Sequence, residues 1–271
     1  MELVQTFISK AKKEPLRVVF PEGVDPRIAE AALRANALGI ARPVLLQGEE
    51  VVRQVAREKG LSDEGVVFQT AADQSLLSRY AEQYAEARGV RTAVAAKLVK
   101  KPLSFAGMMV RSGDADGMVA GVDCATALVI QAASVTVGYQ EGISTPSSFF
   151  AMVIPELLGE KDRVLVFADC AVTVQPDARQ LAEIAVTSGH NARQLLGIEP
   201  RVALLSFATK GSANHADVDK VVEAVGMARE MDPGFEIDGE LQADAALVPR
   251  VAQKKVKQSS VAGRANVLGF P

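Results

Sequence analysis

The sequence predicts an α/β protein with a largely parallel sheet, and three observations lead to this prediction. Short runs of β-branched and other apolar residues alternate with longer segments of helical periodicity along the 271 residues. Some expected strands, such as 163–167, are continuously apolar, which is typical of a sheet covered on both faces. With 48% hydrophobic and 23% charged residues, the chain has the composition to bury a core.

Strands and helices alternate in the first half of the chain, and several have clear end signals. Asp25 and Pro26 mark a helix start after the strand 17–20, because aspartate accepts backbone N–H groups at an N-cap and proline suits the first turn. Gly39 and Gly60 are placed to end two helices. We expect strands at 17–20, 43–46, 66–68 and 116–120, and helices at 3–11, 25–38, 49–59, 73–87, 92–99, 103–111 and 125–137.

The second half repeats this pattern after a cluster of Gly, Ser, Thr and Pro at 141–146, which indicates a domain boundary. We therefore predict a first domain at 1–142 and a second domain at 143–271. The expected strands are 149–154, 163–167, 201–207, 235–238 and 265–270, and the expected helices are 178–196, 218–231 and 243–252.

Composition narrows the possible partners. The 30 basic residues nearly balance the 33 acidic ones, and aromatic residues make up only 5% with no Trp, which argues against a nucleic-acid-binding surface. Cys124 and Cys170 are too few for a disulfide framework or a four-cysteine zinc site, and suit a reducing compartment. The sequence has no apolar run of membrane-spanning length and no signal peptide, so we expect a cytoplasmic protein without a membrane partner.

Common catalytic motifs are missing from the sequence. It has no Walker A motif, no G-x-G-x-x-G after the first strand, no H-E-x-x-H and no G-x-S-x-G. The two histidines, His190 and His215, have no nearby Ser or Cys in a recognisable arrangement, and we expect both at the surface.

A polar turn at 206–212, which follows the strand residues 201–205, is the most informative local feature. Ligands of open α/β sheets bind beyond the carboxyl ends of the strands, which is where this turn lies. Ser206, Thr209 and Ser212 offer hydroxyl groups, Lys210 offers a cation and Gly211 offers flexibility. This set suits a phosphate group, with an ordinary polar turn as the alternative interpretation.

Two acids and two arginines are further candidates. Glu240 and Asp244 lie four residues apart after a strand, and fit either a divalent-metal site or a helix N-terminus with favourable acids. Arg27, in a first helical turn, and Arg88, at the end of a helix, offer planar forks for phosphate, although a solvated surface position is the alternative. The residues alone therefore indicate an anion-binding α/β protein.

Six stretches together resemble the phosphate acetyltransferase/phosphate butyryltransferase family, collinearly and over essentially the whole chain. They are FPEGVDPRIAEAA (20–32), SGDADGMVAGVD (112–123), VFADCAV (166–172), PRVALLSFATKGSA (200–213), IDGELQADAALVPRVA (237–252) and SSVAGRANVLGFP (259–271). The acetyl branch is the more similar one. The resemblance implies the reaction acetyl-CoA plus phosphate giving CoA plus acetyl phosphate, with coenzyme A as a substrate and no tightly bound cofactor or metal.

The resemblance also implies a fold and a set of binding residues. The fold would be two αβα domains with a cleft between them, as in isocitrate and isopropylmalate dehydrogenases, in a homodimer. Arg27 and Arg88 match family arginines associated with CoA or phosphate recognition, and the segment 209–212 matches a strand-end loop that faces the cleft. Gln131 lies where the family often has an arginine, and because glutamine carries no charge we expect weaker anion binding.

Family members continue past the position of Pro271 with an Asp-Leu-Ser-Arg-Gly stretch and a following Asp, which supply a serine, a phosphate-binding arginine and the proposed base. On this resemblance we expect a C-terminally truncated chain with low activity and an incomplete first domain, and we assign no catalytic residue. One alternative is a non-catalytic module that binds CoA or acyl phosphate. Another is a metal-dependent dehydrogenase of the same fold that uses Glu240 and Asp244, against which the missing nucleotide fingerprint argues.

Overall fold

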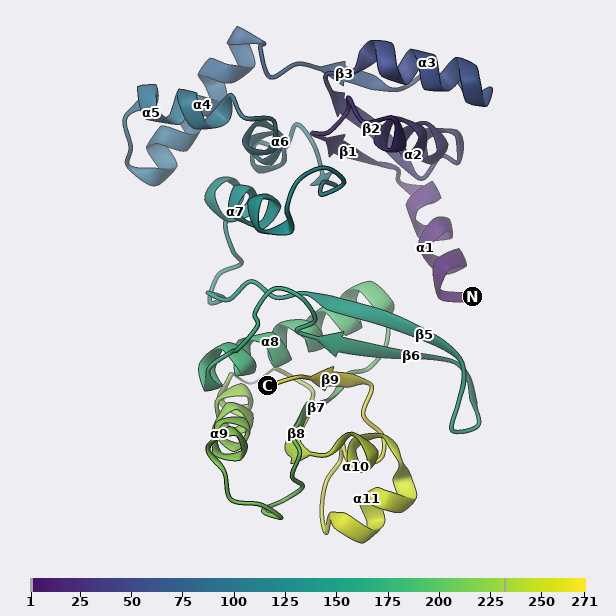
Figure 1. Ribbon diagram of the computed structural model, residues 1–271, viewed down its shortest axis with the longest axis vertical. Coiled ribbons are helices and arrows are strands. Elements are labelled where there is room, and N and C mark those ends of the chain that lie inside the picture. Colours follow the sequence, from purple (N-terminus) through teal and green to yellow (C-terminus); the bar gives the residue numbers. More distant parts are fainter. Residues whose placement is uncertain (1, 232) are drawn as a thin grey trace. The chain divides into compact units, whose positions relative to one another are not determined.

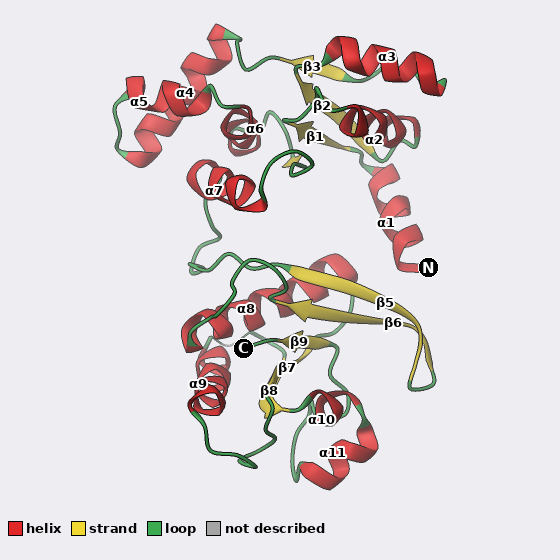
Figure 2. Ribbon diagram, viewed as in Figure 1, coloured by secondary structure: helices red, strands yellow, loops and turns green. Residues whose placement is uncertain are grey.

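The computed structural model describes residues 2–231 and 233–271 and contains two β-sheets, each flanked by helices. This arrangement confirms the predicted α/β class (Figures 1 and 2). From residue 4 onward the chain divides into two compact units, which are residues 4–139 and residues 140–271. The domain limits at 1–142 and 143–271 stay a prediction.

The unit of residues 4–139 is built on a parallel four-stranded sheet with the order β3-β2-β1-β4. Its strands are β1 (Leu16–Phe20), β2 (Ala41–Leu46), β3 (Val67–Gln69) and β4 (Gly117–Met118). The helices of this half of the chain are α1 (Glu2–Lys13), α2 (Pro26–Ala37), α3 (Glu49–Lys59), α4 (Gln74–Arg88), α5 (Thr92–Val99), α6 (Pro102–Arg111) and α7 (Thr126–Thr136).

Helices cover both faces of this sheet. Because successive side chains of a strand point to opposite faces, each strand contributes to the core on both sides. In β1, Val18 packs with α2 and α3, whereas Val19 packs with α4 and α6. On the second face the rings of Tyr80 and Phe105 meet edge to face, with their centroids 5.2 Å apart. Burial on both sides explains the continuously apolar strands.

The unit of residues 140–271 is built on a mixed five-stranded sheet with the order β5-β6-β9-β7-β8. Its strands are β5 (Phe149–Leu157), β6 (Glu160–Ala168), β7 (Arg201–Leu205), β8 (Glu236–Leu241) and β9 (Val267–Gly269). Its helices are α8 (Ala178–Asn191), the π-helical turn η1 (Ala192–Leu196), α9 (Ala216–Glu230), α10 (Ala243–Leu247) and α11 (Pro249–Lys255). The strand β5 runs antiparallel to β6, and the other pairs are parallel.

Two core clusters cover the two faces of this second sheet. Helices α8 and α9 pack on one face, where Leu181 and Val221 are buried against Leu204. Helix α10 and the segment around Val261 cover the other face. The strand β9 lies between β6 and β7, so the last of these strands in the sequence occupies the middle of the sheet.

Several expected elements differ from the structure in their bounds, and two differ more clearly. The predicted helix at 243–252 is broken into α10 and α11 at Val248, whose backbone is extended because the next residue, Pro249, disfavours the helical conformation there. The strand expected at 116–120 pairs with β1 over two residues only.

No helix within the described part of the chain is long and apolar enough to cross a membrane.

Candidate substrate-binding site

A pocket of about 470 Å³ lies at the carboxyl end of the parallel sheet in the unit of residues 4–139. Glu22 follows β1, Gln47 follows β2 and Asp123 follows β4, and all three line this pocket. Open α/β sheets bind ligands beyond the carboxyl ends of their strands, so this pocket lies where a ligand site is expected. We call it the strand-end pocket.

One face of α7 forms a wall of the strand-end pocket. The lining residues Leu128, Gln131, Ala132 and Val135 follow a spacing of three and four residues, which places them on one side of a helix. Gln131, singled out from the sequence, therefore lies in the pocket.

Apolar side chains and a few charged groups share the remaining walls. Leu98 and Leu103 supply apolar surface, Lys101 is basic, and Asp25 and Asp123 are acidic. A mainly apolar cavity with a small number of polar groups is typical of a small-molecule site.

Glu22 holds the loop at the edge of this pocket. The residue is 8% exposed, and its carboxylate accepts hydrogen bonds from the backbone N–H groups of Gly121 (2.7 Å), Val122 (3.1 Å) and Asp123 (2.7 Å). Burial alone would raise the pKa of Glu22, but these donors outweigh burial and hold the pKa below its ordinary value. Burial and the neighbouring carboxylate of Glu22 raise the pKa of Cys124, so its thiol stays protonated near neutral pH.

Arg27 lies beside the pocket and is bound by its neighbour in sequence. Its Nε and Nη2 atoms lie 3.0 and 2.7 Å from the two carboxylate oxygens of Asp25. Asp25 also accepts the N–H of Arg27 and caps α2, as predicted, and the guanidinium lowers its pKa to about 2. The Arg27 guanidinium is otherwise exposed to solvent.

Arg88 reaches the far end of α7. It donates from Nε to the carbonyl of Val135 (3.1 Å) and from Nη2 to the carbonyl of Ser134 (2.9 Å). A guanidinium has five N–H groups, so three remain for other acceptors. Arg88 therefore binds the C-terminal end of α7, the helix that contains Gln131.

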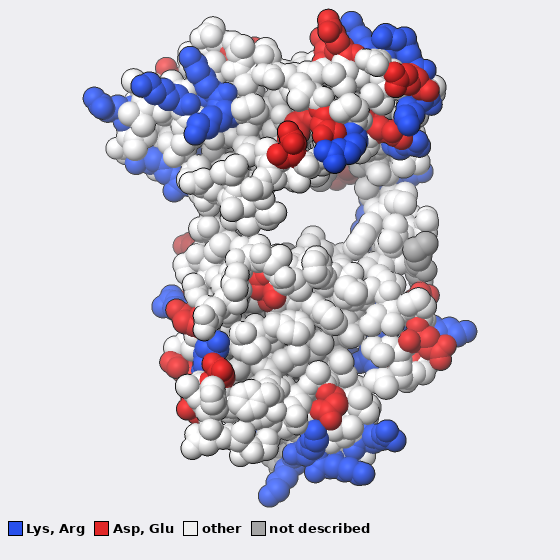
Figure 3. All heavy atoms as spheres, in the orientation of Figure 1, with Lys and Arg blue, Asp and Glu red and all other residues white. Residues whose placement is uncertain are grey.

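Positive charge accumulates in this region. Residues 88–101 contain five basic residues and no acidic one. Figure 3 shows Lys and Arg side chains gathered over the surface of α4 and α5. Such a local excess attracts anions although the whole chain carries a net charge of -3.

The predicted polar turn lies beyond the carboxyl end of β7, as the sequence indicates, and is bound to the end of β8. Lys210 donates from Nζ to Asp238 (2.6 Å) and to the carbonyl of Gly239 (2.5 Å). The backbone N–H of Gly211 donates to Glu240 (2.6 Å). The cation and one backbone donor of the turn therefore already have partners within the protein.

The hydroxyl groups of the turn also shape it. Thr209 Oγ1 accepts from the N–H of Gln242 (2.9 Å), and Ser212 Oγ accepts from the N–H of Thr209 (3.0 Å). Ser206 Oγ accepts a longer hydrogen bond from Ala208 N (3.3 Å). Gly211 has φ +78°, in the left-handed region that glycine adopts without strain.

Asp238 is a central residue of this region that the sequence analysis did not identify. It is buried, and its partners are Lys210, Arg229 (3.1 Å) and the hydroxyl of Ser259 (2.5 Å). Burial would raise the pKa of Asp238, but these partners hold it below its ordinary value. The only signal in the sequence was its position as the last residue of the expected strand 235–238.

The two acids considered for a metal have separate partners. Glu240 accepts from Gly211, whereas Asp244 forms an ion pair with Lys255 (2.9 Å). Within residues 2–231 and 233–271, no group of three or more His, Cys, Asp or Glu side chains is arranged to hold a metal ion.

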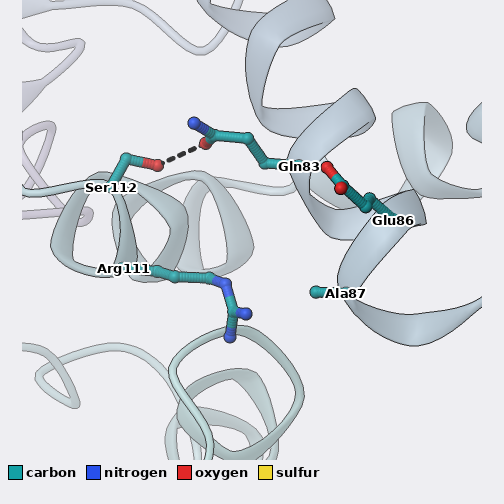
Figure 4. Close-up of a pocket in the computed structure, with 5 residues that line it drawn as sticks. All are labelled: Gln83, Glu86, Ala87, Arg111 and Ser112. Atoms are coloured by element: carbon teal, nitrogen blue, oxygen red, sulfur yellow. Dashed lines mark hydrogen bonds between the residues drawn. The ribbon is translucent and has the colours of Figure 1, made fainter.

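A second pocket of about 420 Å³ lies among polar groups of α4 and α6 (Figure 4). It is lined by Gln83, Glu86, Ala87, Arg111 and Ser112. Ser112 donates to Gln83 (2.6 Å), while the side chain of Arg111 extends away from this pair.

Comparison with known proteins gives matches over the whole chain. The sequence model of the phosphate acetyl/butaryl transferase family matches residues 2–271. The chain is 43% identical to a phosphate acetyltransferase of Thermoanaerobacterium thermosaccharolyticum over 274 residues, covering 100% of this chain and 83% of that protein. A phosphate acetyltransferase of Bacillus subtilis is 36% identical over 272 residues, covering 100% of this chain and 82% of that protein.

Solved structures agree. The EutD phosphotransacetylase from Staphylococcus aureus superposes with a TM-score of 0.88 at 34% identity, covering 100% of this chain and 82% of that one. A phosphotransacetylase from Streptococcus pyogenes gives a TM-score of 0.89 at 35% identity, covering 100% of this chain and 81% of that one. The family resemblance of the six sequence stretches is thereby confirmed, and the chain belongs to the phosphate acetyl/butaryl transferase family.

Proposed function

We propose that this protein is a phosphate acetyltransferase, which transfers an acetyl group reversibly between acetyl phosphate and coenzyme A. The observation that carries this proposal is the full-length similarity, at 36–43% identity, to proteins named phosphate acetyltransferase. The similarity to solved phosphotransacetylases over the whole chain supports the same reaction.

The reaction sets three requirements for the site. The thiol of coenzyme A loses its proton to a base, its sulfur forms a bond to the acetyl carbonyl carbon, and the bond from that carbon to the phosphate oxygen breaks. A thiol with a pKa of about 8.5 needs such a base near neutral pH. The developing oxyanion and the leaving phosphate need hydrogen-bond donors or positive charge, and none of these tasks requires a metal or a tightly bound cofactor.

In this proposal the strand-end pocket and its surroundings bind coenzyme A. Arg27, Arg88 and the basic run of residues 88–101 attract its phosphate groups, and Gln131 contributes an uncharged polar group. The apolar wall of α7 suits the uncharged part of the same molecule.

The turn after β7 is proposed to bind the phosphate or acetyl phosphate group. Ser206, Thr209 and Ser212 supply hydroxyl groups at the strand end. Gly211 allows the turn its shape, and its N–H already donates to Glu240. Lys210 contributes less charge than its sequence position indicates, because Asp238 already neutralises it.

We further propose that the two units are the αβα domains of a fold like that of isocitrate and isopropylmalate dehydrogenases, and that the protein is a cytoplasmic homodimer. Helices on both faces of each sheet support the layer arrangement.

The test is thioester formation by the purified 271-residue protein with acetyl phosphate and coenzyme A. We expect one phosphate released for each acetyl-CoA formed, with no added metal requirement. Calorimetric binding of coenzyme A without turnover would instead identify a binding module. Metal-dependent reduction of NAD with a hydroxyacid, without thioester formation, would identify the dehydrogenase alternative.

A further inference from the structure

Helix α7 forms a wall of the strand-end pocket although little of it is buried in a core. Only Ala132 and Thr136 are buried among its residues. Thr136 packs against α6 at Gly107, where an added Cβ atom would collide with the threonine side chain. Burial of apolar side chains therefore contributes little to holding α7 in its position.

The segment before α7 is held by Glu22. Both carboxylate oxygens of Glu22 are occupied, one by the N–H groups of Gly121 and Val122 and the other by the N–H of Asp123. The N-cap residue of α7 is Ala125, which makes no side-chain capping hydrogen bond. Glu22 thus places a negative charge before the N-terminal end of α7, where the helix dipole is positive.

The other end of α7 is held by Arg111. Its Nη1 atom donates to the carbonyls of Thr136 (3.0 Å) and Val137 (3.4 Å), and Arg88 binds the two preceding carbonyls. The last turn of α7 contains no basic residue of its own. Carbonyl groups at a helix C-terminus lack intrahelical partners and carry negative partial charge, so a guanidinium from another helix is favourable there.

We infer that Glu22 and Arg111 are positioning residues for the strand-end pocket, which hold α7 from its two ends so that Leu128, Gln131 and Val135 face the ligand. Arg111 does not line this pocket, and the carboxylate oxygens of Glu22 are engaged by backbone donors. Arg111 therefore acts on the ligand through α7, whereas Glu22, which lines the pocket, acts through the loop 121–123 that leads into α7. The identity of the ligand as coenzyme A rests on the proposed function.

The predicted signature is weaker ligand binding with unchanged chemistry. Displacing α7 moves the pocket wall in the free protein and in the complex, so it alters the affinity for coenzyme A and leaves the later acyl-transfer step unaffected. Simple destabilisation of the fold would instead reduce the amount of active protein and leave the affinity of the remaining fraction unchanged.

The experiment combines hydrogen exchange with calorimetry on Glu22→Gln and Arg111→Gln in the full chain. We expect amides at 121–123 to exchange about tenfold faster in the first variant, and the last turn of α7 about tenfold faster in the second, because each loses hydrogen bonds of a charged group. The Kd for coenzyme A should rise about tenfold in each variant. In Arg111→Gln, whose residue does not line the strand-end pocket, kcat should stay within about twofold of the parent.

Two further variants serve as controls. Arg111→Lys keeps a cation near the carbonyls and should return exchange and Kd to within about threefold of the parent. Glu183→Gln removes a carboxylate that binds the backbone N–H groups of Ser144 and Thr145, which is the same chemistry in the other unit, and should leave exchange in α7 unchanged.

Unchanged exchange of α7 and its preceding loop in both glutamine variants would overturn the inference. Faster exchange with an unaltered Kd would also overturn it, because α7 would then be held without serving the pocket. A failure of the proposed function looks different, since the parent protein itself would not bind coenzyme A. The hydrogen-exchange data alone would then show whether Glu22 and Arg111 hold α7 in place.

Discussion

Lys210 and Asp238 form an ion pair in which the ammonium nitrogen lies 2.6 Å from a carboxylate oxygen, and the Asp238 side chain is 7% exposed. The pair joins the turn after β7 to the adjacent strand β8. A buried carboxylate needs such partners because removing it from water is costly. Lys210 therefore has a structural role in addition to any contact with a substrate.

Replacing Lys210 with alanine should lower the free energy of unfolding by about 2 kcal/mol, since Asp238 keeps Arg229 and Ser259 but loses its closest cation. Urea denaturation measures this change. The matched control is Lys255→Ala, which removes an exposed ion pair with Asp244 and should cost less than about 1 kcal/mol. Equal effects of the two substitutions would contradict the structural role of Lys210.

Glu183 should make stability depend on acid pH. Its side chain is 1% exposed, and although burial would raise its pKa, donors from Ser144 and Thr145 and from Arg179 hold the pKa below the ordinary 4.5. A lowered pKa stabilises the folded state fully above pH 4.5, and this contribution disappears as the pH falls through the lower folded value.

The variant Glu183→Gln should therefore be less stable than the parent at neutral pH, and the difference should shrink as the pH falls below 4.5. Urea midpoints across a pH series measure it. A difference that stays constant down to acid pH would show that the ionised form of Glu183 contributes no stability.

Gly107→Ala should destabilise the protein by about 1–3 kcal/mol, because the added methyl group meets the side chain of Thr136. Thermal or urea unfolding tests this, and the double substitution with Thr136→Ala should recover part of the loss. Gly226→Ala is the control in α9, where an added Cβ has open space. It should stabilise the protein by about 0.5–1 kcal/mol, and a similar loss at both glycines would refute the α6–α7 contact as the cause.

Gln131→Arg should tighten coenzyme A binding about tenfold, because it adds a charged donor to the strand-end pocket. Calorimetry at two salt concentrations measures the affinity, and the gain should decrease at high salt. Ala127→Arg adds the same charge to α7 at an exposed residue outside the pocket lining. An equal gain there would mean that general attraction, and not the pocket, is responsible.

The sequence predicts the elements of this fold well because their signals are local. Asp25 caps α2 and Gly60 ends α3, as predicted. The antiparallel direction of β5 was not predicted, since nothing in an apolar strand states which way its partner runs.

Only part of the candidate site can be predicted from the sequence, because residues that bind each other there are distant along the chain. The turn at 206–212 was predicted at a strand end, but the bond from Lys210 to Asp238 spans 28 residues. Glu22 was not singled out at all, since the loop that it binds begins 99 residues later. Local patterns indicate where a polar group lies, and tertiary contacts determine whether that group is free to bind a ligand.

The place of β9 in the middle of its sheet has a consequence for how the chain folds during synthesis. On the ribosome, residues 4–139 emerge with all four strands of their sheet before β9 has been translated. The strands β6 and β7 cannot be bridged until Val267–Gly269 leave the exit tunnel. Until then, two strand edges that are buried in the finished sheet remain open, which exposes the partly translated chain to aggregation and to chaperone binding.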